Sequence, residues 1–303
     1  MKPLRDAIRP TTLIEGRELT PDRRLALTVV SETLQHTGSF KFRAAYNVVL
    51  NVPNDELIAA SSGNFGQALA YACRLAGKKC TVVMPGNSAR VKVEAVRSYG
   101  AAVDLIDTEK VTRAERIKQL AREHPEAYIA SAYDDRLVID GNATLADEIA
   151  GIGFDTVVVP VGGGGLISGI IEGFERAQKT VEIVGAEPLL GNDAARSLKA
   201  GRIIANDHEP QTIADGARTL SVGINNFAVM RRGVGGIIEV KEARIAEAVR
   251  LYYTRCSLKC EPTGALSLAA VLQEPQRFTG KRIAVIVSGG NVDADTYSRL
   301  IKS

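Results

Sequence analysis

The chain has 303 residues, of which 45% are apolar and 24% are charged, and its net charge at pH 7 is +3. These values are typical of a globular protein with about two domains, and they give no reason to expect nucleic acid or a membrane surface as a partner. The longest apolar runs, such as RIAVIV, are too short to span a bilayer, and the first residues contain no apolar signal segment. We therefore expect a cytoplasmic protein.

Strands and helices are predicted to alternate along most of the chain. Lys41 lies between Phe40 and Phe42, in an N-terminal segment that precedes the two series described below. Apolar runs typical of strands lie at 56–64, 79–85, 101–107, 156–161, 181–188 and 281–290. Helical periodicity occupies 65–77, 88–100, 113–124, 165–177, 242–256 and 263–273.

The strand and helix runs form two series, at roughly 55–130 and 155–290. Continuous Val/Ile runs bounded by glycine indicate strands buried on both faces, as in parallel sheets. Strand, crossover helix and strand in succession predict a doubly wound α/β fold. We expect two such domains with a ligand cleft between them.

Four consecutive glycines follow the run VVVPV and precede the predicted helix that begins near Leu166. Backbone N–H groups at a glycine turn and a helix N-terminus form an anion site, so the sequence predicts bound phosphate here. A tight turn without a ligand is the alternative. The dinucleotide pattern Gly-x-Gly-x-x-Gly fails at Ile167 and at Ser168, and no nucleotide P-loop motif is present.

Lys41 has two interpretations. A lysine beside aromatic rings is commonly a surface residue with its amine in water. If its amine is desolvated, however, its pKa falls and it becomes a nucleophile. A nucleophilic amine and a separate phosphate site together match the requirements of pyridoxal phosphate.

Five motifs follow one another in the order TGSFKFRAA, SSGNFGQALA, VGGGGLISG, EPTGA and VSGGNVD. With them the chain resembles the fold-type II pyridoxal-phosphate enzymes of the serine/threonine dehydratase and serine racemase group. The resemblance implies two doubly wound open-sheet domains of the tryptophan synthase beta-like kind, with the cofactor in the cleft between them. It implies a large cofactor-binding domain at 1–45 and 136–303, a small substrate-loop domain at 46–135, and a homodimer.

The same resemblance implies residue roles. Lys41 is the Schiff-base lysine, and Ser62 is a second catalytic base on the opposite face of the substrate. The implied cofactor-binding residues are Phe40, Lys41, Asn64, Gly162, Gly163, Gly164, Gly165, Leu166, Glu261 and Ser288. The implied substrate-binding residues are Ser61, Ser62, Gly63, Asn64 and Phe65. Ser62 has an alternative role, which is to cap the helix that follows it.

A metal site is also implied. Glu187, Gly191 and Asp193 have the spacing of a divalent cation site in the racemase-like members, and all-oxygen ligands suit Mg²⁺ or Ca²⁺. A solvated acidic turn is the alternative. Among the four cysteines, Cys256 and Cys260 lie four apart on a predicted helix, and we expect reduced thiols rather than a zinc site.

Ser288 indicates the reaction type. It faces the pyridine nitrogen in the family, and a neutral hydroxyl leaves the ring a weaker electron sink than a carboxylate would. We therefore predict an ammonia-lyase that removes water from a β-hydroxy amino acid such as serine, threonine or 3-hydroxyaspartate and yields a 2-oxo acid and ammonia. Racemisation, β-replacement and cofactor binding without catalysis are the alternatives.

The chain departs from the family pattern at two places. Phe65 stands where relatives commonly have histidine, and Asp140, Asn142 and Ala143 replace an Ala-Gly-Gln-Gly-Thr run. Because that run approaches the substrate side chain in relatives, we expect a substrate other than plain serine or threonine. Asp215 and Arg218 are expected to border the site. We expect no C-terminal regulatory domain.

Overall fold

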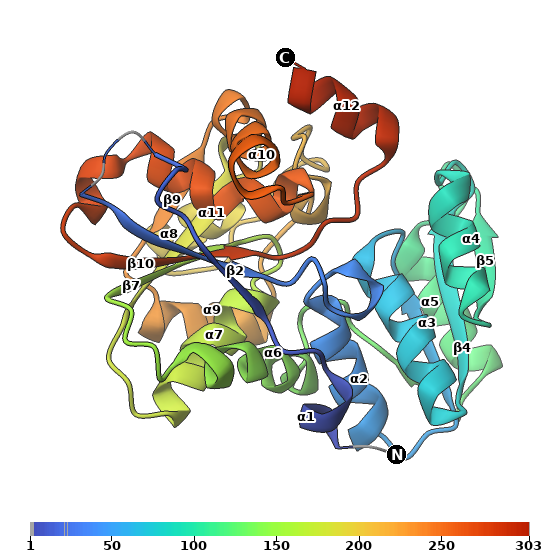
Figure 1. Ribbon diagram of the computed structural model, residues 1–303. Helices are drawn as coiled ribbons and strands as arrows, with labels where there is room; N and C mark the ends of the chain where they lie inside the picture. The colour runs from blue at the N-terminus through green and yellow to red at the C-terminus, as the bar shows by residue number, and fades with distance from the viewer. Residues whose placement is uncertain (1–2, 21, 23, 303) are drawn as a thin grey trace.

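The computed structural model describes residues 3–20, 22 and 24–302. Where a predicted domain includes residues 1, 2, 21, 23 or 303, that part of the prediction lies outside the described residues. Two β-sheets, each covered by helices, stand side by side (Figure 1). No helix among the described residues is long and apolar enough to cross a membrane.

The larger sheet has six strands, of which the first is antiparallel to its neighbour and the other five are parallel. Its order is β1 (Thr12–Glu15), β2 (Ala26–Ser31), β10 (Arg282–Val287), β7 (Thr156–Pro160), β8 (Glu182–Pro188) and β9 (Ile237–Val240). The N-terminal strands therefore join the sheet built from the second half of the chain.

The smaller sheet has four parallel strands in the order β5 (Ala102–Ile106), β4 (Lys79–Pro85), β3 (Glu56–Ala60) and β6 (Tyr128–Ile129). Its core alternates as expected for a sheet covered on both faces. Leu57 and Ala59 pack with α2 (Lys41–Asn51) and α3 (Asn64–Ala76), whereas Ile58 packs with α5 (Arg113–Glu123) on the opposite face.

Helices cover both faces of the larger sheet as well. One core contains α10 (Glu242–Cys256) and α11 (Pro262–Gln273), and the other contains α6 (Arg136–Ile149), α7 (Gly165–Arg176) and α9 (Ile224–Gly233). The remaining helices are α1 (Leu4–Ala7), α4 (Arg90–Ser98), α8 (Asp193–Ala200) and α12 (Ala294–Lys302). The prediction of two doubly wound α/β units is confirmed.

Two local predictions need comment. α10 ends at Cys256 and the chain turns at Ser257, where φ is +51°, so Cys260 does not continue that helix as predicted. The predicted domain boundary at residue 45 falls inside α2, whose buried side chains pack with α3. The division into 1–45 with 136–303 and 46–135 stays a prediction.

Candidate active site

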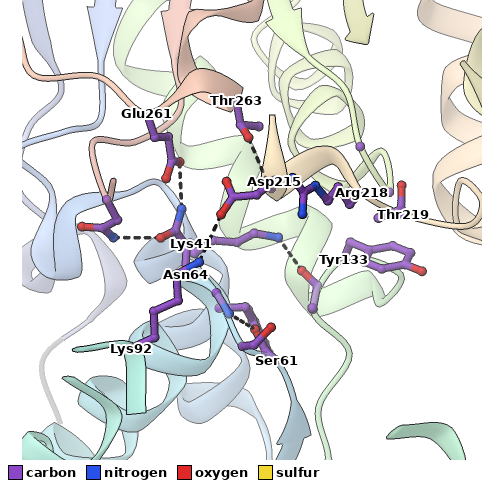
Figure 2. A pocket seen from close by; sticks show the side chains of 18 of the residues that line it. Lys41, Ser61, Asn64, Lys92, Tyr133, Asp215, Arg218, Thr219, Glu261 and Thr263 are labelled. Carbon is purple, nitrogen blue, oxygen red and sulfur yellow. Dashed lines mark hydrogen bonds and ion pairs between the residues drawn. The ribbon is translucent and has the colours of Figure 1, made fainter. Parts of the chain in front are cut away.

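A cleft of about 1380 Å³ opens where the carboxyl ends of strands from both sheets meet. It is lined by the residues that follow β3, β7 and β10, and by Phe40 and Lys41 at the start of α2. In parallel sheets this edge is where ligands bind. Figure 2 shows how the main side chains surround it.

Lys41 is held next to the end of β10. Ser39 and Gly289 form an isolated β-bridge, the N–H of Phe40 donates to the carbonyl of Ser288 at 3.0 Å, and the N–H of Gly290 donates to the carbonyl of Gly38 at 3.0 Å. These backbone bonds bring two predicted motifs together from opposite ends of the chain.

The amine of Lys41 is desolvated. Its Nζ donates to the carbonyl of Ala132 at 2.7 Å and lies 5.1 Å from the ring centre of Phe40 and 5.8 Å from that of Phe65. Burial lowers the pKa of Lys41 to about 8, although the charge of Glu261 acts in the other direction. A larger fraction of the amine is therefore neutral and nucleophilic near pH 7 than for a lysine in water. The interpretation of Lys41 as a solvated surface residue is wrong.

Asn64 is at the centre of a polar chain across the cleft. Its Nδ2 donates to Glu261 Oε1 at 2.8 Å, and its Oδ1 accepts from Asn291 Nδ2 at 2.8 Å. Burial, followed by the charge of Asp215, raises the pKa of Glu261 to about 8. Glu261 is therefore mostly protonated at pH 7. The sequence motifs did not identify Asn291, because nothing in VSGGNVD marks that side chain as a partner of Asn64.

The two serines of the substrate loop have different roles. Ser61 Oγ accepts from the N–H of Gly66 at 3.1 Å and of Gly63 at 3.4 Å, so Ser61 stabilises the start of α3. No side chain in the described structure caps α3 from Gly63, and Ser62 makes no such bond. The alternative role of Ser62 as a helix cap is therefore wrong. Both serines, together with Gly63, Asn64 and Phe65, line the cleft.

The glycine loop connects β7 to α7 as predicted, and its five predicted residues, Gly162 to Leu166, all line the cleft. Gly164 has φ +89°, which favours glycine, and α7 begins at Gly165. A Cβ on Gly163 would clash with the ring atoms of Tyr133, so this ring packs directly on the loop. Ser288, which directly follows β10, is buried and also lines the cleft.

The two acidic residues predicted to bind metal lie near the end of β8 and at the start of α8. Both oxygens of Glu187 accept N–H bonds, from Ala194 and Ala195 at the start of α8. Asp193 is buried, its Oδ1 accepts from Asn206 at 2.9 Å, and its Oδ2 has no hydrogen-bond partner among the described residues. The alternative of a solvated acidic turn is wrong.

Both acids have altered proton affinity. Burial raises the pKa of Asp193 to about 7, and burial with the neighbouring charge of Asp193 raises the pKa of Glu187 well above its ordinary value. Two adjacent buried carboxylates favour a bound cation or proton. Among the described residues, however, no group of three or more His, Cys, Asp or Glu side chains could hold a metal ion, so the cation site stays a prediction.

The segment with unusual residues lies elsewhere. Asp140 forms an ion pair with Arg136 on α6, whereas Asn142 and Ala143 are buried against α7, and none of the three is part of the cleft lining. The expectation that this segment approaches the substrate side chain is wrong. Polar side chains that sequence reasoning missed do line the cleft, namely Lys92, Arg113, Tyr133, His208 and Thr219.

Asp215 and Arg218 border the cleft as expected. Asp215 pairs with Lys92 at 3.1 Å across it, and Arg113 pairs with Glu209 at 3.4 Å. The guanidinium of Arg218 donates to the backbone carbonyl of Thr212 at 2.6 and 2.9 Å. Figure 2 shows Asp215, Arg218 and Thr219 along the same wall, with the Lys41 side chain in front of it.

A desolvated amine, a glycine loop and a polar chain thus meet in one cleft. The sequence pattern of a family described as "Pyridoxal-phosphate dependent enzyme" matches residues 4–289. The chain belongs to this family. The predictions of a fold-type II pyridoxal-phosphate enzyme and of its dehydratase and racemase group are confirmed.

Three relatives illustrate the group. The chain is 37% identical over 298 residues to the L-threo-3-hydroxyaspartate ammonia-lyase of Pseudomonas sp, with 96% of this chain and 93% of the relative covered. It is 33% identical over 302 residues to the serine racemase of Mus musculus, with 96% and 88% covered. The crystal structure of the T.th. threonine deaminase superposes with a TM-score of 0.88 at 39% identity, with 96% and 95% covered.

Proposed function

We propose that this enzyme is an ammonia-lyase that acts on a β-hydroxy amino acid with an acidic side chain, with L-threo-3-hydroxyaspartate as its main substrate. The observation that carries the proposal is the desolvated amine of Lys41 in a cleft that also contains a guanidinium with no carboxylate partner among the described residues. The 3-hydroxyaspartate lyase of Pseudomonas sp supports it.

The site residues fit pyridoxal phosphate. Lys41 would attach the cofactor, Phe40 would pack against its ring, and the N–H groups of Gly162 to Leu166 would bind its phosphate. Asn64 and Ser288 would bind the ring oxygen and the ring nitrogen. Glu261 would keep Asn64 oriented through their hydrogen bond of 2.8 Å. When bound, the cofactor supplies an electron sink for the pair left behind at the substrate Cα.

The chain's own residues then move the protons. Lys41, with a pKa near 8, accepts the Cα proton as a neutral amine and afterwards holds it as an ammonium within reach of the leaving hydroxyl. Ser288 contributes no charge to the ring nitrogen, which favours elimination over reactions that need a long-lived carbanion. The substrate α-carboxylate binds at Ser61 and the first N–H groups of α3, because a helix N-terminus attracts anions.

Arg218 is the residue we assign to the second carboxylate. It lines the cleft, and within the described part of the chain its guanidinium bonds only to the carbonyl of Thr212. Lys92 and Arg113 also line the cleft, but they pair with Asp215 and Glu209. Lys259 lines it too, but an ammonium lacks the planar pair of donors with which a guanidinium binds both oxygens of a carboxylate. Arg218 can therefore pair with an acidic side chain without breaking an existing ion pair.

The test is 2-oxo acid release from serine, threonine, phenylserine and 3-hydroxyaspartate stereoisomers, with the wild type and Arg218→Gln. We expect the highest kcat/KM for L-threo-3-hydroxyaspartate, and a loss of at least about tenfold in Arg218→Gln for this substrate only. Equal kcat/KM for serine and 3-hydroxyaspartate would refute the substrate assignment. No release from any substrate would refute the lyase.

Racemisation is the second candidate. Ser61, not Ser62, stabilises the start of α3, so the hydroxyl of Ser62 is available as a base on the second face of the substrate. Formation of a D-amino acid would reveal this activity.

A Mg²⁺ or Ca²⁺ ion at Glu187, Gly191 and Asp193 is supported by the buried Oδ2 of Asp193, which has no partner among the described residues. The homodimer stays a prediction.

A further inference from the structure

Two buried asparagines lie behind the glycine loop. Asn226 on α9 and Asn142 on α6 are 0% and 1% exposed. Asn226 Nδ2 donates to the carbonyl of Gly163 at 2.7 Å, and Asn142 Nδ2 donates to the carbonyl of Gly165 at 3.0 Å. Since both contacts are to carbonyl oxygens, the nitrogen of each side-chain amide must face the loop.

These bonds, together with the N–H of Gly223, which also donates to the carbonyl of Gly163 at 3.1 Å, fix the orientation of the loop peptides. In a trans peptide the C=O and N–H groups point in opposite directions. When Asn226 holds the carbonyl of Gly163, the N–H of Gly164 is turned away from α9, and the same argument relates Asn142 to the N–H of Leu166. Gly164 and Leu166 line the cleft, where a bound anion would accept from these N–H groups.

Two glycines leave room for these side chains, Gly164 in the loop and Gly169 in α7. A Cβ on Gly164 would lie 2.9 Å from the Cβ of Asn226, and a Cβ on Gly169 would lie 2.5 Å from the Cβ of Asn142. The Oδ1 atoms of both asparagines are buried without a hydrogen-bond partner among the described residues. An unpaired buried amide oxygen destabilises the folded state. Each asparagine therefore contributes to this site through its Nδ2 donor alone.

Asn226 also connects the loop to Lys41. Its Nδ2 donates to the carbonyl of Tyr133 at 3.0 Å, and the neighbouring carbonyl of Ala132 accepts from Lys41 Nζ at 2.7 Å. The carboxylate of Asp134 accepts the first N–H groups of α9 at 2.9 Å. One helix end therefore fixes both the glycine loop and the segment that holds the amine.

We propose that Asn226 and Asn142 are positioning residues for the cofactor phosphate, which fix the N–H groups of Gly164 and Leu166 in place before the anion binds. The inference rests on the proposed function in one respect, which is that the glycine loop binds the phosphate of pyridoxal phosphate.

The test compares pyridoxal 5'-phosphate with pyridoxal, which lacks the phosphate. Kd for each is measured on the full chain freed of cofactor, for the wild type, Asn226→Asp and Asn142→Asp. Each substitution keeps the side-chain shape and removes the donor, but an ionised aspartate would also repel the phosphate. Asn226→Leu and Asn142→Leu, which remove the donor without adding a charge, are therefore measured beside them and must show the same fall in the ratio. Gln273→Glu is the matched control, because Gln273 Nε2 donates to the carbonyl of Glu239 at 2.8 Å outside the cleft.

We expect the wild type to bind pyridoxal phosphate much more tightly than pyridoxal. The ratio of the two Kd values should fall at least about tenfold in each aspartate variant and stay unchanged in Gln273→Glu, as expected for hydrogen bonds to a charged group. Equal weakening of both ligands, or an unchanged ratio, would overturn the proposal.

Two further outcomes are separable. If an aspartate variant does not fold by circular dichroism, the alanine variant of the same residue replaces it, with the same criterion for the ratio. A wild type that binds pyridoxal as tightly as pyridoxal phosphate would contradict the proposed phosphate site itself. In that case the loop binds no phosphate, and the role of the asparagines falls with it.

Discussion

Glu261 titrates abnormally because it is buried next to Asn64 and near Asp215. Its pKa in the folded chain is about 8, compared with 4.5 for an ordinary glutamate. The folded state therefore holds this proton more tightly than the unfolded state does. The stability gained in this way is full below about pH 4.5 and is lost as the pH rises through about 8.

Glu261→Gln keeps an acceptor for Asn64 and removes the titration. For the chain freed of cofactor, we expect the wild type to lose urea stability relative to this variant between pH 5 and pH 8. Midpoints of urea unfolding at several pH values provide the measurement. Parallel pH profiles for the two proteins would show that Glu261 is already ionised in the folded state.

Ser61 and Ser62 make a second comparison at the same scale. Ser61→Ala removes the acceptor for the N–H of Gly66 and should lower the free energy of unfolding by about 1 kcal/mol. Ser62→Ala should leave this free energy unchanged and slow only reactions that need a base on the second face. If Ser62→Ala destabilises the chain as much as Ser61→Ala, the assignment of the helix-start role is wrong.

At the scale of elements, the glycine loop and the Tyr133 ring form one packed unit. The methyl group of Gly163→Ala would clash with the Tyr133 ring, and overpacking of this kind destabilises by about 1–3 kcal/mol. We also expect weaker pyridoxal phosphate binding, because the loop must shift. Gly151→Ala is the control, since its Cβ meets no atom within 4 Å. Thermal unfolding of both variants tests this, and equal Tm values would contradict it.

The elements that the sequence predicted are those with a simple pattern. β7, β8 and β10 are continuous apolar runs, and α5 has a single buried face. α6 was missed because it contains Gly141, Asn142 and Thr144, residue types of low helix propensity, which are buried in this helix. β6 was missed because it has only 2 residues.

The candidate site divides in the same way. Lys41 and the glycine loop belong to short motifs that require particular residue types, so they could be found from the sequence. The bond between Asn64 and Glu261 joins residues 197 positions apart, and Asn226 reaches the loop from α9. Such partners depend on the packing of whole elements, and no local pattern records them.

At the scale of the whole molecule, two ion pairs cross the cleft between the sheets. Lys92 on α4 pairs with Asp215, and Arg113 on α5 pairs with Glu209. α4 and α5 belong with the smaller sheet, whereas both acids lie in the chain between α8 and α9, two helices that pack with the larger sheet. These pairs therefore connect the two sides of the cleft, and we expect them to favour the arrangement in which substrate binds.

Lys92→Met should raise KM about twofold to fivefold with little change in kcat, because a partly exposed pair contributes at most about 1 kcal/mol. The salt dependence of KM should also become weaker. Arg232→Met is the control, since it breaks pairs with Glu172 and Glu175 on the outer face of α7 and α9. Steady-state kinetics at low and high salt provide the measurement. A fall in kcat alone, or equal effects of both variants, would refute a role in closure.

The whole account depends on the assignment of Lys41 as the lysine that carries the cofactor. Two other lysines, Lys92 and Lys259, also line the cleft and serve as internal comparisons for this assignment. The most direct measurement is borohydride reduction of the enzyme with bound pyridoxal phosphate, followed by peptide mass spectrometry. We predict the reduced cofactor on Lys41 alone, and loss of the cofactor absorbance and of 2-oxo acid release in Lys41→Ala. Cofactor on Lys92 or Lys259, or turnover that survives in Lys41→Ala, would contradict this assignment.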